Sequence, residues 1–369
     1  MRILCKGFNL YNQLHQGNNF KRIVEEFVTI FEEPHIEHFL LGHTMTVIVT
    51  DNKGTINCEN CNKRENLILP NSSQIAKVTL STSNLLILSS TGDLFKTSLN
   101  AWELVKVPNF IVDTNDKIKI ITARDKLNVA YSAKGYVYSI PEKLHFCNKN
   151  IVDLQAGREH CILLDKQGNV YSFGAGTKGQ LGTGQLDDEP NPILIEALAG
   201  LRIVAIAAGD WHSAAVSEQG DLYTWGQNSN GQLGLSVSST YDENIVSVMA
   251  TPHLVDISDN PSDVNVVKVA CGNKHTIVLL ENGHLYGSGW NKYKQLKNEN
   301  VKEYFCFTFI HDYSKENVDK VLCGPWNSAV LINRTNYRKK ALRTTCWTAP
   351  TQFSSLISRT GLKLAFKSL

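Results

Sequence analysis

Three histidines recur at equivalent positions of a repeated segment and are the side chains of this chain best suited to chemistry. His160, His212 and His275 each follow a glycine by three positions. Imidazole is a common metal ligand and a general base near neutral pH, so a shared metal centre is the first hypothesis. Equivalent residues of successive repeats are, however, carried apart by the rotation between repeats. We therefore expect no metal site, and expect each imidazole to hydrogen-bond the backbone of a loop.

Other patterns that could support chemistry are incomplete. Cys58 and Cys61 have the spacing of half a zinc site, but a closed structural site needs four ligands and no second pair follows at a suitable interval, so we expect a turn there. The chain also lacks a phosphate-binding glycine loop followed by lysine, a nucleophile elbow and a dinucleotide fingerprint. The sequence predicts no catalytic residue, no metal and no cofactor, and therefore a protein that is not an enzyme.

The elements that position these residues are repeats with a constant internal spacing. A second glycine stands eleven positions after the opening one, an aromatic residue three further on, and a third glycine six after the second. A glutamine and a leucine follow six residues later. We expect the amides of Gln180, Gln232 and Gln295 to satisfy main-chain groups in an irregular turn, since a glutamine amide both donates and accepts hydrogen bonds.

Short apolar or alternating runs bounded by glycine predict that each repeat is a small antiparallel sheet. Gly220 and Gly283 lie where a tight hairpin turn needs a positive φ angle. A single sheet cannot bury both faces, whereas sheets packed around an axis can, as in a propeller. Weaker copies at the same offset bring the repeat openings to seven, and the chain is predicted to be an all-β, seven-bladed β-propeller. The openings are Gly42, Ser81, Arg124, Gly157, Gly209, Gly272 and Gly324.

The two ends of the chain predict how the ring closes. Gly7, followed by Gln13 and Leu14, repeats the spacing of the second half of a repeat, and the copy that opens at Gly324 has only the first half. We expect the N- and C-terminal segments to pair within one blade, which leaves no open sheet edge.

The central repeats resemble a known family. Residues 208–213 (AGDWHS), 222–228 (LYTWGQN) and 231–234 (GQLG) look like the repeat of the regulator of chromosome condensation family, whose fold is a seven-bladed propeller. The resemblance covers residues 1–333, with the first three copies matching by spacing alone. Within the family the chain is most similar to a short member that, the resemblance implies, partners a JmjC-domain histone demethylase or oxygenase.

Charge divides the chain into two parts. Residues 334–369 contain eight of the 37 basic residues and no acidic one, so the 1–333 propeller keeps 29 basic against 35 acidic residues. An acidic body is poorly suited to wrapping DNA. We expect the basic tail, 334–369, to be poorly ordered. A nuclear-import or nucleic-acid-binding extension is the alternative.

The sequence shows no sign of a membrane or secreted location. No apolar run approaches the roughly 20 residues that cross a bilayer, and the start lacks the apolar core of a secretory signal. We expect a monomer in the nucleus, on chromosomes, with the cytoplasm as a second compartment.

The loops that open the repeats are predicted to lie at one end of their strands, so their variable positions ring one face with charges and two tryptophans, a composition typical of interaction hot spots. The alternative is that each tryptophan only packs on a neighbouring blade. We expect the longer crossings, residues 186–192 and 236–252, to lie on the opposite face. The predicted partner-binding positions are Arg158, Glu159, Asp210, Trp211, Asn273, Lys274, Pro325 and Trp326.

Three functions remain open. The family resemblance implies a chromatin-associated adaptor that binds a JmjC-domain enzyme and supports chromosome segregation and spindle organisation, with no small-molecule substrate of its own. The founding branch of the family implies guanine-nucleotide exchange on a nuclear small GTPase, but this chain enters its first strand at once and shows no basic N-terminal arm. A cytosolic scaffold with another partner is the third hypothesis.

Overall fold

The computed structural model describes residues 1–14, 21–50, 55–60, 63–70, 73–98, 103–111, 115–235, 247–257 and 264–333. One compact unit comprises Met1–Arg334. Cys61 and the basic tail lie outside the described residues. Cys58 lies on a strand, Thr55–Asn60, whose last residue pairs with Lys63.

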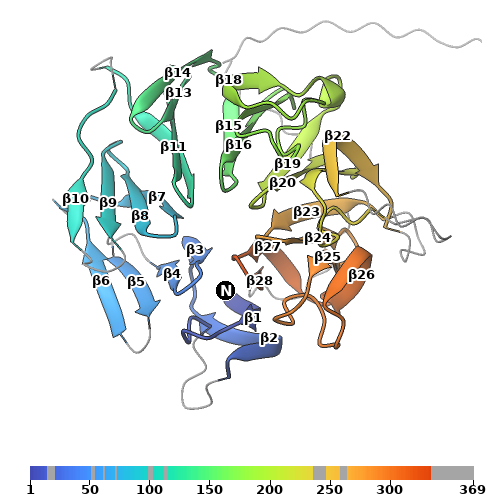
Figure 1. Ribbon diagram of the computed structural model, residues 1–369. Helices are drawn as coiled ribbons and strands as arrows, with labels where there is room; N and C mark the ends of the chain where they lie inside the picture. The colour runs from blue at the N-terminus through green and yellow to red at the C-terminus, as the bar shows by residue number, and fades with distance from the viewer. Residues whose placement is uncertain are drawn as a thin grey trace, which may run out of the picture. The chain divides into compact units, whose positions relative to one another are not determined.

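The Met1–Arg334 unit consists of four-stranded antiparallel sheets arranged around an axis (Figure 1), seven of them in the described residues. Within a sheet, strands that follow one another in the chain are neighbours, and many of these pairs are joined by a short turn. The first three sheets are β3(His38–Leu41), β4(Thr46–Val49), β5(Thr55–Asn60), β6(Lys63–Ile68); β7(Ile75–Leu80), β8(Asn84–Ser89), β9(Leu94–Ser98), β10(Leu104–Lys106); and β11(Ile118–Arg124), β12(Leu127–Ser132), β13(Tyr136–Ser139), β14(Glu142–Cys147).

The next three sheets hold the strong repeats. Their first strands β15, β19 and β23 lie toward the middle of the ring in Figure 1, and a single 3₁₀ turn, Glu196–Leu198, follows β18. The strands are β15(Ile151–Ala156), β16(His160–Asp165), β17(Val170–Gly174), β18(Glu189–Leu194); β19(Ile203–Ala208), β20(His212–Ser217), β21(Leu222–Gln227), β22(Val248–Val255); and β23(Val266–Cys271), β24(His275–Leu280), β25(His284–Trp290), β26(Glu303–Asp312).

The last sheet joins the two ends of the chain, as the sequence predicted. β27(Asn317–Cys323) and β28(Asn327–Asn333) come from the C-terminal side, and β1(Arg2–Phe8) and β2(Ile23–Glu32) from the N-terminal side. β1 pairs with β28 from Arg2↔Ile332 to Gly7↔Asn327. The ring is thus closed by backbone hydrogen bonds, which removes the sheet edge that an open end would expose.

The hydrophobic core lies in layers between adjacent sheets. One layer, for example, packs Ala214 and Val216 of β20 against Val278 and Leu280 of β24. This arrangement explains why polar and apolar residues alternate only weakly along the strands. Each middle strand is covered on both faces, and β16, β20 and β24 are buried at every position. The all-β propeller expected from the repeats is confirmed.

The predicted turn glycines also behave as expected. Gly220 and Gly283 have φ angles of 91° and 88°. The weak repeat openings coincide with the ends of first strands, since Gly42 and Ser81 directly follow β3 and β7 and Arg124 ends β11. No helix among the described residues is long and apolar enough to span a membrane.

Candidate functional site

The loops that open the repeats lie together at one end of the sheets. In the three strong repeats, the histidine that begins the second strand pairs with the glycine near the end of the third, as His160 does with Gly174. Neighbouring loops are joined by backbone hydrogen bonds, since the Arg158 amide donates to the Asp210 carbonyl and the Asn273 amide to the Pro325 carbonyl, both at 3.1 Å. The loops therefore form one connected face around the axis.

The opening glycine is required because the histidine of its own loop packs on it. A Cβ atom at Gly157 would lie 2.0 Å from His160 Cε1, and one at Gly209 would lie 2.1 Å from His212 Cε1. No side chain tolerates such an approach. The glycine and the histidine of the repeat thus act as a pair that fixes the loop.

The three histidines connect adjacent sheets. His160 Nε2 lies 2.8 Å from Ser213 Oγ and His212 Nε2 lies 2.9 Å from Thr276 Oγ1, each hydroxyl belonging to the next sheet. His275 Nε2 lies 3.2 Å from the Asn327 carbonyl oxygen. A backbone partner was predicted for all three. His275 does bind a backbone carbonyl, but that of the first residue of β28 and not of a loop, and Ser328 Oγ also lies 3.3 Å from its Nε2. For His160 and His212 the prediction is wrong, because the second strand of the next sheet supplies a hydroxyl as the partner.

These hydrogen bonds fix the protonation of the imidazoles. Ser213 Oγ donates to the Gln180 carbonyl at 3.1 Å and Thr276 Oγ1 to the Gln232 carbonyl at 2.7 Å, so the histidine Nε2–H is the donor to each hydroxyl. Burial lowers the pKa of His160 to about 3 and lowers the pKa of His212 well below its usual value. Neutral donors that bind a neighbouring sheet are structural groups. In the part of the chain that the structure describes, no three His, Cys, Asp or Glu side chains gather as metal ligands.

The glutamines behave as the sequence predicted. The side-chain oxygen of Gln180 accepts from the Lys178 amide at 2.8 Å, and that of Gln232 from the Asn230 amide at 2.9 Å. Gln295 accepts from the Tyr293 amide at 3.0 Å. All three amides satisfy backbone groups of the turn that follows the third strand.

Arg124 is the central residue of the loop face. Its side chain leaves the end of β11 and donates to Asp210 Oδ1 at 3.1 Å, to the Ala208 carbonyl at 3.0 Å and to Asn273 Oδ1 at 2.9 Å. These acceptors belong to the sheets of β19–β22 and β23–β26, so one guanidinium connects three sheets and passes over the sheet between them. Burial raises the pKa of Asp210 above its usual value, and the positive charge of Arg124 opposes this.

Two of the predicted partner-binding residues therefore hold the ring together. Asp210, expected on the surface, is buried, and Asn273 is partly buried with its amide oxygen bound to Arg124. The sequence could not show this because Arg124 stands where the repeat has lost its glycine, and nothing in one sequence says how far its side chain reaches.

Arg158, Glu159 and Trp211 remain at the surface. Arg158 forms an ion pair of 3.1 Å with Asp125 and its guanidinium carbon lies 5.0 Å from the centre of the Trp211 ring. Glu159 is exposed and Trp211 is partly exposed. These residues form a charged and aromatic surface between two sheets.

Lys274 lies in the loop after β23, in the sheet next to that of Trp211, and Pro325 and Trp326 lie in the loop after β27, one sheet further on; all three are partly exposed. The Trp326 ring packs edge-on against Trp290 of the neighbouring sheet with ring centres 4.7 Å apart, and Lys274 Nζ lies 5.3 Å from the centre of the Trp290 ring. Trp326 thus packs on the neighbouring sheet and is also accessible to solvent. The two alternatives for the tryptophans, packing on a neighbouring blade and contact with a partner, do not exclude each other.

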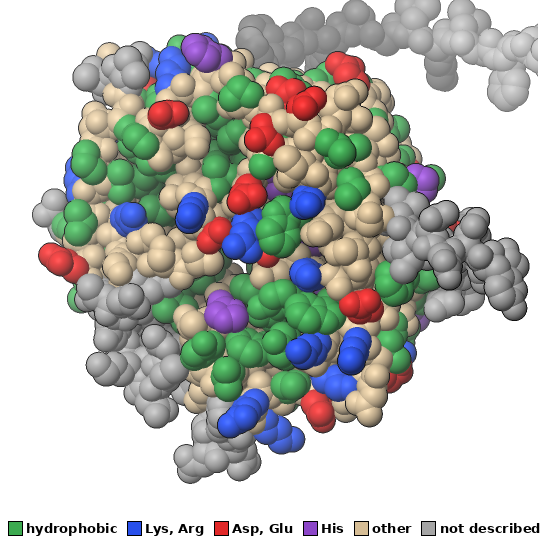
Figure 2. All heavy atoms as spheres, viewed as in Figure 1, with side chains coloured by type: hydrophobic (Ala, Val, Ile, Leu, Met, Phe, Trp, Pro, Cys, Tyr) green, Lys and Arg blue, Asp and Glu red, His purple; other side chains and the backbone are tan. Residues whose placement is uncertain are grey.

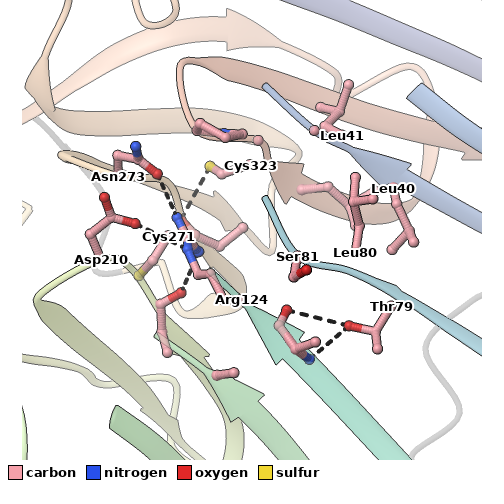
Figure 3. A pocket seen from close by; sticks show the side chains of 18 of the residues that line it. Leu40, Leu41, Thr79, Leu80, Ser81, Arg124, Asp210, Cys271, Asn273 and Cys323 are labelled. Atoms are coloured by element: carbon pink, nitrogen blue, oxygen red, sulfur yellow. Dashed lines mark hydrogen bonds and ion pairs between the residues drawn. The ribbon is translucent and has the colours of Figure 1, made fainter. Parts of the chain in front are cut away.

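A cavity of about 530 Å³ opens among these loops. Arg124, Asp210 and Asn273 lie together on one side of it, and Leu40 and Leu80 lie on the other (Figure 3). Arg158, Pro325 and Trp326 also line it, whereas Glu159, Trp211 and Lys274 do not. The polar groups of the Arg124 side are hydrogen-bonded to one another, and the opposite side combines leucines with Thr79 and Ser81.

The longer crossings were predicted on the opposite face, and this is wrong. Glu189 pairs with Gly174, which pairs with His160, and Asp188 Oδ1 accepts from the Gly176 amide at 2.9 Å. In a sheet of four antiparallel strands, the first and third connections share an end. The acidic segment 186–192 therefore lies at the same end as the loops. Residues 236–246 of the other crossing lie outside the described residues.

Comparison with known proteins agrees with the repeat pattern. The model of the regulator of chromosome condensation (RCC1) repeat matches residues 167–216 and 219–279, and a second model of this repeat matches 151–180, 203–232 and 266–295. RCC1 domain-containing protein 1 from Homo sapiens is 36% identical over 215 residues, which is 48% of this chain and 55% of that protein. The mouse protein of the same name is 36% identical over 231 residues, covering 54% of this chain and 60% of that protein. The matches thus span little more than half the length of these relatives.

The fold is shared with solved structures of much lower sequence identity. The crystal structure of Prp20p from Saccharomyces cerevisiae superposes with a TM-score of 0.74 at 17% identity, covering 91% of this chain and 92% of that one. The fold, the repeat spacing and the family models therefore agree that residues 151–295 of this chain are built from regulator of chromosome condensation repeats.

Proposed function

We propose that this protein is a non-enzymatic adaptor whose seven sheets act as the seven blades of one closed platform and whose loop face binds a partner protein. The partner class that the family resemblance implies is a JmjC-domain histone demethylase or oxygenase. On this proposal the protein works in the nucleus, in association with chromatin, and supports chromosome segregation and spindle organisation. Any enzyme chemistry belongs to the partner.

The observation that carries this proposal is the set of partly exposed tryptophans on the loop face. Trp211 lies beside Arg158, and Trp326 packs on Trp290 beside Lys274. Tryptophan and arginine are the residues most enriched among energetic hot spots, and a large ring already fixed by a neighbour loses little conformational freedom when a partner covers it. The ring closure supports the same function, because a surface on a closed set of sheets is rigid before it binds.

The histidines and carboxylates of the loop face support an adaptor over an enzyme. His160, His212 and His275 are buried and donate to the next sheet, and Asp210 is bound to Arg124. A general base must reach the proton that it removes. These groups instead stabilise the platform.

The test is affinity purification of the tagged full-length chain from nuclear extract, followed by mass spectrometry. We expect a JmjC-domain protein to be recovered with the wild-type chain and to be lost with Trp211→Ala combined with Trp326→Ala. Lys166→Glu, at the exposed turn between β16 and β17 at the opposite end, is the matched control and should retain the partner. If no JmjC-domain protein is recovered, the partner class is wrong. If the double variant retains the partner, the binding face is wrong.

Nucleotide exchange is a second candidate, favoured by the fold shared with Prp20p, whose structure report describes binding to Gsp1p and histones. Release of a fluorescent guanine nucleotide from a nuclear small GTPase tests it. We expect no acceleration by this protein. Acceleration that depends on protein concentration would assign it to the exchange factors instead.

A further inference from the structure

Six aromatic side chains gather on the loop face where the ring closes, and we call them the aromatic seam. They come from the end of β1 and the segment after it, from the loop after β3, from the end of β25 and the turn after it, and from the loop after β27. They are Phe8, Tyr11, His43, Trp290, Tyr293 and Trp326.

The seam is continuous across three sheets. The Phe8 and His43 rings are stacked with centres 5.2 Å apart, Phe8 and Tyr293 lie 4.9 Å apart, and Tyr293 and Trp326 lie 6.1 Å apart. Phe8 is buried, His43 is exposed, and the other four are partly exposed. Contiguous aromatic surface of this kind on a protein marks an interaction site, because each ring offers a large apolar area at low entropic cost.

The seam continues into the cavity of about 530 Å³ among the opening loops, which we call the axial cavity, on the side that carries the leucines. His43 and Trp326 line both, and beyond them lie the partly buried leucines Leu40, Leu41 and Leu80, with Thr79 and Ser81 beside them (Figure 3). The other side is occupied by Arg124 and its three acceptors. What the cavity, about 530 Å³ in all, offers a ligand is therefore a leucine-lined side opposite the guanidinium of Arg124.

Basic side chains border the seam. Lys274 lies over the Trp290 ring, Lys292 and Lys294 flank Tyr293 in the turn after β25, and the backbone carbonyls of Lys21 and Arg22 bind Asn9 next to Phe8. On the face shown in Figure 2, blue side chains gather with green ones in the lower part of the view, where β1, β2 and β26 lie in Figure 1, and red ones are frequent near the upper edge. Lysines therefore border the seam, and the Lys294 ammonium also donates to the Glu299 carbonyl and to Asn300 Oδ1.

We infer that the aromatic seam and the leucine-lined side of the axial cavity together bind an acidic peptide segment of the partner. One large apolar side chain of that segment enters the cavity beside Trp326, and its carboxylates lie against Lys274 and the lysines of the neighbouring turn. This inference rests on the proposed function and specifies its partner chemistry. Charge complementarity selects an acidic segment, and the leucines of the cavity select an apolar anchor.

A single-stranded nucleic acid fits the same surface less well. Base stacking needs free ring faces, whereas Trp290 and Trp326 meet edge-on at 86° and Lys274 covers the face of Trp290. The acidic segment 186–192 on the same end would also repel phosphates. Nucleic acid is therefore an outcome that the experiment has to distinguish.

The probe is a displayed library of short random-sequence peptides selected on the full-length chain. We expect selection to enrich peptides with several acidic residues next to a leucine, phenylalanine or tryptophan. Binding of a selected peptide, measured by fluorescence polarisation, should weaken at least about 30-fold with Trp326→Ala, as for a central hot spot. It should also weaken with Lys274→Glu and with increasing NaCl, because the contacts at Lys274 are ionic.

Matched controls separate the possible failures. Lys166→Glu, at the opposite end, should leave peptide binding unchanged, and thermal unfolding should show that every variant is folded. Loss of binding with Trp211→Ala but not with Trp326→Ala would overturn the seam while keeping a binding face. Enrichment of peptides without acidic residues, or tighter binding of a single-stranded oligonucleotide than of any peptide, would overturn the inference itself. Recovery of a partner in the affinity purification would leave the proposed function standing in each case.

Discussion

Arg124 stabilises the opening loops in a repeat that lacks the usual glycine and histidine. The strong repeats fix their opening loop with a glycine and a histidine, and this repeat has neither. Its arginine instead connects three sheets through Asp210, Asn273 and the Ala208 carbonyl. The side chains of Arg124 and Asp210 are only 20% and 8% exposed, so the pair is shielded from solvent and each charge depends on the other.

We predict that Arg124→Ala lowers the free energy of unfolding by about 3 kcal/mol, because it leaves the buried Asp210 carboxylate without its cation. Urea unfolding measures the change. Arg202 and Glu218 form an exposed ion pair of 2.9 Å, with 61% and 50% of their side chains accessible, and serve as the control. Arg202→Ala should cost no more than about 1 kcal/mol. Equal losses for the two variants would show that the central arginine is an ordinary surface charge.

Lys6 is a second residue whose environment determines its chemistry. It lies on β1, is 2% exposed, and its ammonium donates to the Leu296 carbonyl at 2.9 Å. Burial lowers the pKa of Lys6 to about 8. The folded state therefore loses this proton at a lower pH than the unfolded state, and folding near pH 7 carries the cost of a buried charge.

We predict that the contribution of Lys6 to stability rises by about 3 kcal/mol as the pH increases through 8 to above 10, since the unfolded state then binds more protons than the folded one. Chemical unfolding at a series of pH values should show this rise in the wild type and not in Lys6→Met. The exposed Lys96→Met is the control and should keep the wild-type profile. If the free energy of unfolding of Lys6→Met rose with pH as in the wild type, Lys6 would have to be solvated in the folded state.

At the scale of elements, β1 is the strand on which ring closure depends. It lies between β28 and β2, and its register with β28 runs without interruption. Beyond the ladder, the Phe8 amide donates to the Trp326 carbonyl at 3.1 Å and the Asn327 side chain donates to the Phe8 carbonyl. The closing sheet is thus held together by contacts between strands from the two ends of the chain. β1 is an inner strand of this sheet and not an edge strand.

We predict that deletion of residues 1–16 lowers the free energy of unfolding by more than about 5 kcal/mol, because it leaves β28 unpaired and β2 without a neighbour. This exceeds the cost of losing an edge strand, because β1 has a neighbour on each side. Differential scanning calorimetry gives the comparison. The matched control is truncation after residue 333, which we expect to leave the melting temperature unchanged. An unchanged melting temperature for the N-terminal deletion would contradict closure through β1.

At the scale of the whole molecule, three neutral imidazoles connect consecutive sheets along one side of the ring. His160, His212 and His275 are all fully buried. Burial lowers the pKa of His160 and His275 to about 3 and lowers the pKa of His212 well below its usual value. Each histidine gains a proton on unfolding once the pH lies below its unfolded pKa, near 6.5.

We predict that stability is complete above pH 6.5 and falls as the pH decreases toward 4, with the three histidines together contributing a slope of about 4 kcal/mol per pH unit. Urea unfolding at each pH measures the slope. His212→Gln removes one titrating group and should reduce the slope by a third, whereas the exposed His145→Gln should not change it. If His212→Gln did not reduce the change in the free energy of unfolding per pH unit, the buried histidines could not be its source.

The repeat pattern predicted most of the architecture, and the reason is local. Each repeated residue acts on a group only a few positions away in the chain. The opening glycine makes room for the histidine of its own loop, and the glutamine accepts a hydrogen bond from an amide of its own turn. The site was predicted only in part. Trp211, Trp326 and Arg158 lie in the opening loops as predicted, and their role in binding stays a prediction, whereas Asp210 is buried and the acidic crossing 186–192 lies on the same face as these loops.

The sequence by itself determined the propeller, the pairing of its two ends and the end of the strands at which the variable loops lie, because these follow from spacing along the chain. Only the tertiary structure showed that Arg124 reaches across the axis, that aromatic residues as distant in sequence as Phe8, His43 and Trp326 meet at the closing sheet, and that leucines line one side of the axial cavity. Contacts between sheets join positions with no fixed separation in sequence, so no periodicity encodes them. They exist only once the ring has closed and brought the two chain ends together.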